Sequence, residues 1–185
     1  GVAQASAVQT KIFAERSGTV TYQDVREIEE TINGKMRKVV VSQNAKLLIG
    51  KNEYDIPTGS EILVEDGSKV KRRQEILEFD PYQIPIISAE EGIVEFRELY
   101  VKENYDIKYG VTERTAIKPM EQGDINPRIV IFSDTEEREK IAEYNIPFGA
   151  YLMVKEEEHV GKGKVLAKIM KVSEGTKNIT GGLPR

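Results

Sequence analysis

The stretch Tyr144–Met170, YNIPFGAYLMVKEEEHVGKGKVLAKIM, decides the fold, because the chain contains a second version of it. Tyr54–Asp80, YDIPTGSEILVEDGSKVKRRQEILEFD, aligns with it without a gap at an offset of 90 residues. Identical Tyr, Ile, Pro, Gly, Val and Val residues recur at 54/144, 56/146, 57/147, 59/149, 64/154 and 70/160. A repeat at a fixed offset indicates two copies of one structural unit.

Each copy has the pattern of two strands joined by a turn. The shared Ile-Pro-x-Gly sequence is a turn signal, because proline fixes φ and glycine tolerates a positive φ. A short apolar run follows, at Ile62–Val64 and at Leu152–Val154. A polar break then leads to a second apolar run, at Ile76–Leu77 and at Val165–Ala167. Runs of this length between turns are typical of β-strands.

The opening strand of the unit also recurs. Ser17–Tyr22, SGTVTY, and Glu91–Phe96, EGIVEF, match at an offset of 74 residues. Because the offset grows from 74 to 90, the second copy should carry about 16 extra residues between its opening strand and its core. Lys118–Pro127 is the predicted place for some of them.

Three further segments have the composition of strands, namely Ile12–Phe13, Asn44–Ile49 and Arg128–Phe132. The spacing of Val25, Ile28 and Ile32 allows a short helix or a strand, and Asn33-Gly34 favours a tight hairpin leading into Lys38–Val41.

The fold class expected from these patterns is mostly β, with short helical turns. Asp134–Ala142 is the predicted site of one or two helical turns, capped by Asp134 or Thr135. We expect four parts: a linker at residues 1–11, a first module at 12–86, a second module at 87–172 and a tail at 173–185.

Composition limits the possible functions. Net charge is −4, from 27 basic and 31 acidic residues, which argues against a chain that coats nucleic acid but not against a local basic patch. The absence of cysteine excludes disulfides and thiolate sites. No apolar run has membrane-spanning length and no signal-peptide pattern is present, so we expect an intracellular protein without a membrane partner.

One basic cluster lies in the turn of the first repeat. It consists of Lys69, Lys71, Arg72 and Arg73, and its counterpart in the second repeat, Lys162-Gly163-Lys164, is weaker. The cluster predicts contact with a nucleic-acid backbone or another partner, and a solubilising turn is the competing interpretation. Aromatic residues make up only 7% of the chain, which disfavours a stacking platform for single strands.

The remaining candidate chemistry is weak. His159, which follows three glutamates, could bind a metal or transfer protons, but a solvated turn is the preferred interpretation because no second ligand set is visible. No phosphate-binding loop and no Ser/His/Asp arrangement occurs, so we predict neither an active site nor a cofactor in this chain.

His159–Ile169 resembles the second half of a biotinyl or lipoyl carrier domain. In that family the modified lysine precedes the hairpin, whereas Lys171 follows it here. The resemblance therefore favours a barrel-sandwich shape and disfavours carrier activity.

The tail resembles a different family. GTKNITGGLPR is similar to the stretch that follows the trigger-loop insertion in bacterial RNA polymerase β′ subunits, where an Asp replaces Asn178. The residues of this arm are Gly175, Thr176, Lys177, Asn178, Ile179, Thr180, Gly181, Gly182, Leu183, Pro184 and Arg185. Gly1–Ser6 looks like the segment after the first trigger helix, and the two repeats look like tandem sandwich-barrel hybrid motifs.

The resemblance implies a non-catalytic insertion within a nucleotidyltransferase. It implies modulation of trigger-loop folding, and hence of elongation, pausing and transcript cleavage, through downstream DNA, the polymerase jaw or factors. The implied partners are the β, α, ω and sigma subunits, template DNA and RNA, in the cytoplasm at the nucleoid. Magnesium and structural zinc are implied elsewhere in the parent subunit.

No catalytic residue of the family carries over. Its magnesium-binding motif, Asn-Ala-Asp-Phe-Asp-Gly-Asp, has no counterpart, and Asn44-Ala45-Lys46 does not match it. Because both ends would feed one loop, Gly1 and Arg185 should lie close together. The alternatives are a carrier domain and a free-standing β adaptor.

Overall fold

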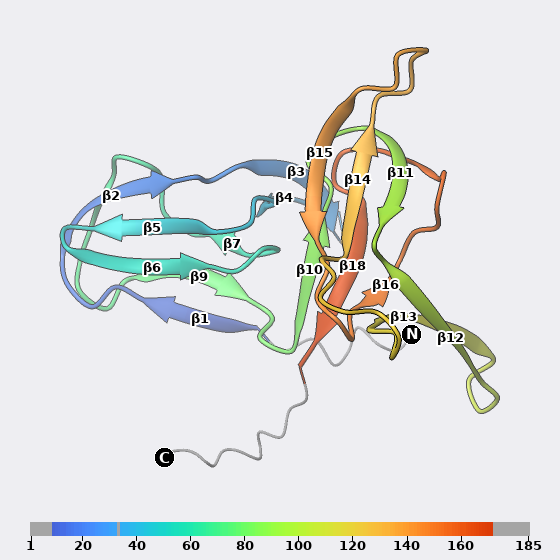
Figure 1. Ribbon diagram of the computed structural model, residues 1–185. Helices are drawn as coiled ribbons and strands as arrows, with labels where there is room; N and C mark the ends of the chain where they lie inside the picture. The colour runs from blue at the N-terminus through green and yellow to red at the C-terminus, as the bar shows by residue number, and fades with distance from the viewer. Residues whose placement is uncertain (1–8, 33, 172–185) are drawn as a thin grey trace.

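The computed structural model describes residues 9–32 and 34–171, and within them the chain forms β-strands and no helix (Figure 1). The first module comprises β1 (Thr10–Phe13), β2 (Gly18–Gln23), β3 (Glu27–Ile32), β4 (Lys35–Val40), β5 (Ala45–Ile49), β6 (Asn52–Ile56), β7 (Glu61–Ile62), β8 (Lys69–Val70) and β9 (Glu75–Phe79). The second module comprises β10 (Gln83–Ile87), β11 (Gly92–Arg97), β12 (Tyr100–Asp106), β13 (Val111–Ile117), β14 (Arg128–Phe132), β15 (Lys140–Asn145), β16 (Tyr151–Leu152), β17 (His159–Val160) and β18 (Val165–Met170). The expected mostly β fold is confirmed.

The two modules repeat one strand arrangement. In the first module β9 lies between β1 and β7, and in the second β18 lies between β10 and β16. The other sheet has the order β6-β5-β2-β8 in the first module and β15-β14-β11-β17 in the second. The repeat predicted from the sequence is therefore a repeat of structure.

A hairpin extends the first sheet of each module in the same way. Val40 of the β3–β4 hairpin exchanges backbone hydrogen bonds with the turn at Gly59 and Ser60, at 2.8 and 2.9 Å. Ala116 of the β12–β13 hairpin does the same with Gly149 and Ala150, at 2.7 and 2.9 Å. The preferred hairpin is confirmed, since β3 pairs with β4 and Ile32 lies opposite Lys35, although Asn33 itself is outside the described residues.

Each module has its own apolar core between its two sheets. Leu47 of β5 and Ile76 of β9 are completely buried in the first core, as are Ile129 of β14 and Leu166 of β18 in the second. Burial of an aliphatic side chain of this size contributes about 1.5–3 kcal/mol. The two cores are separate, so each module has its own source of stability.

The residues shared by the two repeats serve the same turns. Gly59 and Gly149 adopt positive φ angles of 91° and 93°, as the Ile-Pro-x-Gly signal predicts. The repeated tyrosines are buried, and their hydroxyls accept hydrogen bonds of 2.8 Å from the amides of Glu15 (Tyr54) and Ala89 (Tyr144). Tyr54 thus joins β6 to the loop after β1, and Tyr144 joins β15 to the loop after β10.

The extra residues of the second module lie in three places. The offset between equivalent residues is 74 at Gly18/Gly92, 76 at Val40/Ala116, 82 at Ile49/Ile131 and 90 at Tyr54/Tyr144. Two extra residues therefore belong to the β12–β13 hairpin, six to the segment around 118–127, and eight to the loop between β14 and β15. That loop extends beyond the body of the module at the top of Figure 1.

The predicted helical turns at Asp134–Ala142 are wrong. The segment is the loop of a long hairpin, closed by a 2.8 Å hydrogen bond from the Ser133 amide to the Glu139 carbonyl, and β15 already begins at Lys140. Arg138 has a positive φ of 49°, a conformation that a right-handed helix cannot contain.

Two strands fall at the expected limits of the first module. β1 begins at Thr10, inside the expected linker, and β10 spans the expected boundary between residues 86 and 87. Among the strands that the structure describes, β10 pairs with β18 alone and so lies at the edge of its sheet, where Pro85 needs no ladder hydrogen bond on its free side. Residues 1–8 and 172–185, with the tail arm and both chain ends, lie outside the described residues.

The β3–β4 hairpin of the first module packs against the second module. Val39 and Val41 form a small buried cluster with Ile87 and Ala89. Arg26, just before the hairpin, pairs with a Glu90 carboxylate oxygen at 2.7 Å and donates to the Ala89 carbonyl at 3.0 Å. The modules are therefore joined by apolar packing and a directed ion pair, besides the short connection at residues 80–82.

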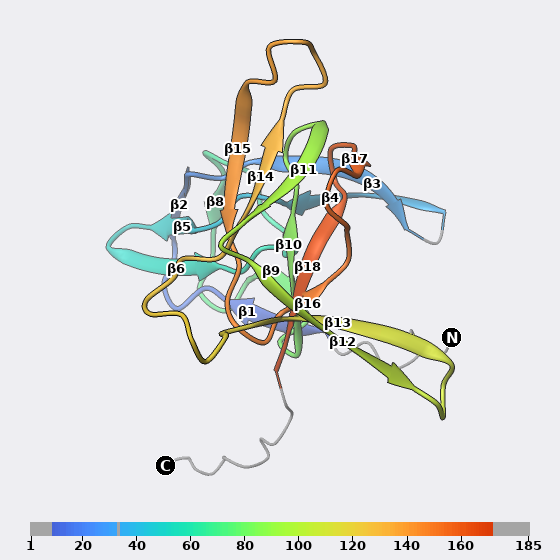
Figure 2. The ribbon, with the colours of Figure 1, turned by 45° about the vertical axis from the view of Figure 1, so that its right-hand side comes forward.

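The chain enters the first module and leaves the second at one place. Thr10 pairs with Phe79, and the Lys171 amide donates to the Tyr82 carbonyl at 2.8 Å. Only two residues separate Phe79 from Tyr82, a span of about 10 Å at most. In Figures 1 and 2 the start of β1 and the end of β18 lie beside this connection. Among the described residues there is no helix that could span a membrane.

Gly92→Ala should destabilise the chain by about 1–3 kcal/mol, because a Cβ there would collide with the Phe132 carbonyl and lie 2.8 Å from Ile131 Cγ2. Gly161→Ala is the control, since a Cβ at that exposed position meets nothing within 4 Å. Urea unfolding of the whole chain measures both. Equal midpoints for the two variants would contradict the close approach of β11 and β14.

Tyr144→Phe should lower the free energy of unfolding by about 1–3 kcal/mol, because it removes the hydroxyl that accepts a hydrogen bond from the buried amide of Ala89. Tyr54→Phe should cost less, because the amide that it leaves belongs to Glu15, an exposed residue that water can reach. Thermal unfolding of both variants beside the parent chain tests the order. A larger loss for Tyr54→Phe would show that these hydroxyls do not act as described.

Candidate functional site

The predicted basic cluster lies on one exposed turn. Lys69 is in β8, and Lys71, Arg72 and Arg73 form the turn into β9, with all four side chains exposed. Arg73 has a φ of 73°, and its amide donates to the Ala14 carbonyl at 2.7 Å. The turn is therefore held against the strand that opens the module.

Two further cations, which the sequence analysis did not include, lie at the same end of the module. Arg16 lies two residues after Ala14, the residue to which the turn is bonded, and Lys51 lies in the turn between β5 and β6. Gly18 shows that these parts are neighbours. It pairs with Val70, beside Lys69 and Lys71, and a Cβ built on Gly18 would lie 3.7 Å from the amide nitrogen of Gly50, which precedes Lys51. We call the set Arg16, Lys51, Lys69, Lys71, Arg72 and Arg73 the basic end. A shallow hollow between its parts is lined by Ser17, Gly18, Thr19, Lys69, Val70 and Lys71.

The side chains of the basic end do not pair directly with carboxylates in the part of the chain that the structure describes. None of its six side chains takes part in an ion pair within the described residues, although basic residues elsewhere in both modules do. Glu15, the nearest acidic residue in sequence, accepts a 3.0 Å hydrogen bond from Asn52. The basic end therefore presents concentrated positive charge to solvent on a chain of net charge −4.

The second module handles its charges differently. Glu95 accepts hydrogen bonds from Arg97 at 2.8 Å and Arg138 at 2.7 Å, and the guanidiniums of both lie over the Phe132 ring. Arg97, followed by Arg138, holds the pKa of the Glu95 carboxyl below its usual value. Glu157 is the main cause of a raised pKa at Arg138. This cluster is internally compensated, and it fixes the long β14–β15 loop.

The other predicted candidates are not assembled into a site. His159 is exposed in β17, with Nε2 3.4 Å from a Glu91 carboxylate oxygen. Lys164 lies 4.0 Å from Glu158. Within the described residues no three His, Cys, Asp or Glu side chains come together as a group that could hold a metal. Lys171, the residue of the carrier comparison, follows β18 at the junction rather than at a hairpin tip.

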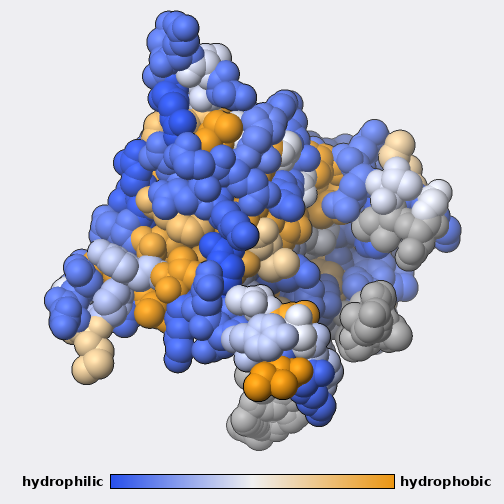
Figure 3. All heavy atoms as spheres, turned by 90° about the vertical axis from the view of Figure 1, so that its right-hand side faces the viewer, coloured by the Kyte–Doolittle hydropathy of each residue, from blue (hydrophilic) through white to orange (hydrophobic). Residues whose placement is uncertain are grey.

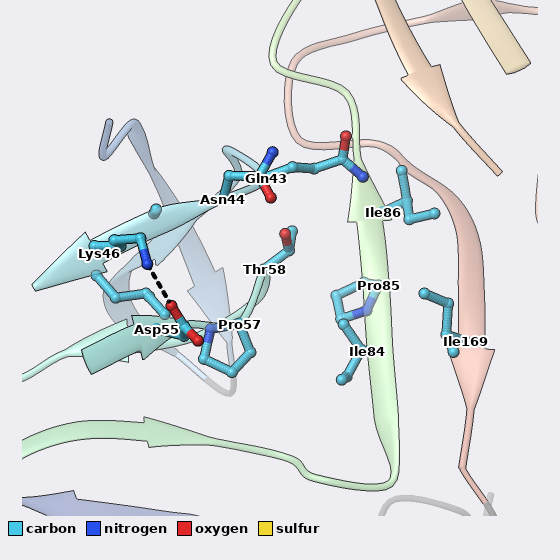
Figure 4. Close-up of a pocket in the computed structure, with 12 residues that line it drawn as sticks. Gln43, Asn44, Lys46, Asp55, Pro57, Thr58, Ile84, Pro85, Ile86 and Ile169 are labelled. Carbon is cyan, nitrogen blue, oxygen red and sulfur yellow. Dashed lines mark hydrogen bonds and ion pairs between the residues drawn. The ribbon is translucent and has the colours of Figure 1, made fainter. Parts of the chain in front are cut away.

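A groove between the modules was not expected from the sequence (Figure 4). Ile84, Pro85 and Ile169 of the second module form one wall, and Pro57 and the 3.0 Å Lys46–Asp55 pair belong to the other. Its volume is about 370 Å³. Three of its polar side chains are already engaged, since Lys46 is paired with Asp55 and the Thr58 hydroxyl donates to the Ser42 carbonyl at 3.0 Å.

The β12–β13 hairpin extends from the second module (Figure 2). Its tip carries exposed apolar and aromatic side chains. Ile107 is 85% exposed, and Tyr105 and Tyr109 are more than half exposed. The tip is ordered by Asp106, whose carboxylate accepts from the Lys108 amide at 2.9 Å. Figure 3, which faces this side of the second module, shows apolar groups among a mainly hydrophilic surface.

No family model matches the chain. Curated relatives do: it is 45% identical over 185 residues to a protein named DNA-directed RNA polymerase subunit beta' from Fusobacterium nucleatum, and all of the chain is covered. A protein of the same name from Methylacidiphilum infernorum is 35% identical over 195 residues, and one from Rickettsia prowazekii is 34% identical over 172 residues, or 83% of the chain.

The chain spans only a small part of these relatives, 14% of the first two and 12% of the third. The similarity to the first two nevertheless covers both modules and the ends of the chain that the structure does not describe. We conclude that the chain belongs to the DNA-directed RNA polymerase β′ family, as the counterpart of a segment of that subunit.

Proposed function

We propose that the chain is a non-catalytic insertion in the trigger loop of a bacterial RNA polymerase β′ subunit, and that its two modules bias the folding of that loop. Sequence similarity to β′ subunits supports a place in this enzyme, and the resemblance of Gly175–Arg185 to the second arm of the loop supports the position within it. Both the DNA template and the RNA product are then neighbours, together with the β, α, ω and sigma subunits.

The observation that carries this proposal is the common entry and exit point. Thr10 and Lys171 are both bonded to the short connection between the modules, through Phe79 and Tyr82. A body with this geometry can be inserted in a loop without forcing the two arms of the loop apart. A domain with its entry and exit at opposite ends would hold the arms open.

The mechanism is indirect. A trigger loop that folds against the incoming nucleotide in each addition cycle is a mobile element whose folding limits the rate. Modules attached to it change its equilibrium only by the difference between their contacts in its two states. A difference of about 1 kcal/mol changes the ratio of the states about fivefold, which is enough to alter pausing and cleavage.

The carrier alternative has less support. In carrier domains the modified lysine precedes the hairpin, whereas Lys171 follows it and lies at the junction, with its amide bonded to Tyr82. A free-standing adaptor would not need the tail arm at Gly175–Arg185.

Replacement of residues 11–172 by a short Gly/Ser linker in the whole polymerase tests the proposal. Single-nucleotide addition should continue, because no family catalytic motif lies in the removed segment, while pause lifetimes and the rate of transcript cleavage should change about fivefold or more. Rapid-quench kinetics on one template measure all three rates.

A series of linkers of about 4, 8 and 12 residues is the control. A rate change that disappears with the longer linkers would come from strain at the new junction. Unchanged addition, pausing and cleavage with every linker would overturn the proposal.

A further inference from the structure

We propose that the basic end of the first module binds the sugar–phosphate backbone of duplex DNA. The inference rests on the proposed function for its setting, since an insertion in a polymerase works beside DNA, but the binding itself is tested separately. It assigns a ligand to six side chains, Arg16, Lys51, Lys69, Lys71, Arg72 and Arg73.

The internal repeat shows that the fold does not require cations at these positions. The equivalents of Arg16, Lys69, Lys71, Arg72 and Arg73 in the second module are Glu90, His159, Gly161, Lys162 and Gly163. Only one of these five positions keeps a lysine or arginine, although the backbone pairing around them is the same. The charge is therefore a property of this module and not of its architecture.

The same comparison shows that this end of a module is a contact surface. In the second module it is covered by the β3–β4 hairpin: Arg26 pairs with Glu90 at 2.7 Å, and a Cβ at Gly163 would lie 2.7 Å from Ile28 Cδ1. In the first module the equivalent backbone positions carry Arg16 and Arg73, which are exposed. The surface that is covered by the first module in one copy of the repeat thus presents exposed guanidinium groups in the other copy.

The chemistry of the basic end selects its ligand. Three arginines and three lysines, without a carboxylate partner in the described residues, suit a polyanion with closely spaced charges, and a guanidinium matches phosphate in a bidentate manner. The hollow between the cations is lined by no aromatic residue, so it offers no side chain on which an unpaired base could stack. Duplex DNA, bound through phosphates and without sequence preference, fits these features.

The first experiment measures binding of the 185-residue chain to a fluorescent 30-base-pair duplex by anisotropy at a series of salt concentrations. The variant K69Q/K71Q/R72Q/R73Q should bind at least about tenfold more weakly at 50 mM salt, and its slope of log affinity against log salt should fall by about 3. The control K102Q/K118Q/K155Q/K162Q removes the same charge from exposed lysines that have no ion pair in the described residues, and it should bind like the parent.

Equal losses in both variants, or no binding by the parent at 50 mM salt, would overturn the proposal. Near-equal melting temperatures of the variants exclude unfolding as the cause. In the assembled polymerase on DNA, a photocrosslinking residue at position 72 should label duplex DNA. Labelling of an acidic protein surface would instead assign the basic end to a protein partner and reject the DNA contact. Neither result depends on the pausing kinetics that test the proposed function.

Discussion

Pairing between the first and last strands closes each module and determines its organisation. β1 lies against β9 and β10 against β18, so each module ends where it began. With the ends of each module fixed together, only residues 80–82 are needed to join the two. The sheets, the separate cores and the common point of entry and exit all follow from this arrangement. Removal of either pairing would free the edge strand that brings the two ends of that module together.

Much of this organisation could be predicted from the sequence, because turns have a strong local code. The repeated Ile-Pro-x-Gly identifies its turns directly, and Gly34 marks the turn between β3 and β4, since few residues other than glycine tolerate the positive φ angles at these positions. β6 and β15 were not predicted because each is a half-exposed edge strand beside its turn, with little apolar pattern. β10 contains Pro85 and looked like a boundary, although the edge of a sheet accepts it.

The basic end shows the corresponding limit for sites. Lys69, Lys71, Arg72 and Arg73 are close in sequence and were found as a cluster. Arg16 and Lys51 are distant in sequence, and only the pairing of β2 with β5 and β8 brings them to the same end. Local charge counts cannot show such convergence, nor can they show that Glu90 takes the place of Arg16 where the second module meets the first.

The closure of each module by its terminal strands also has a consequence for folding during synthesis. The partners in β1–β9 and β10–β18 are far apart in sequence, and such contacts form slowly. In residues 9–32 and 34–171, however, neither module takes a strand from the other. The first module can therefore complete its sheets while the second is still being translated, and the β3–β4 hairpin is then ready as a surface on which the second module assembles.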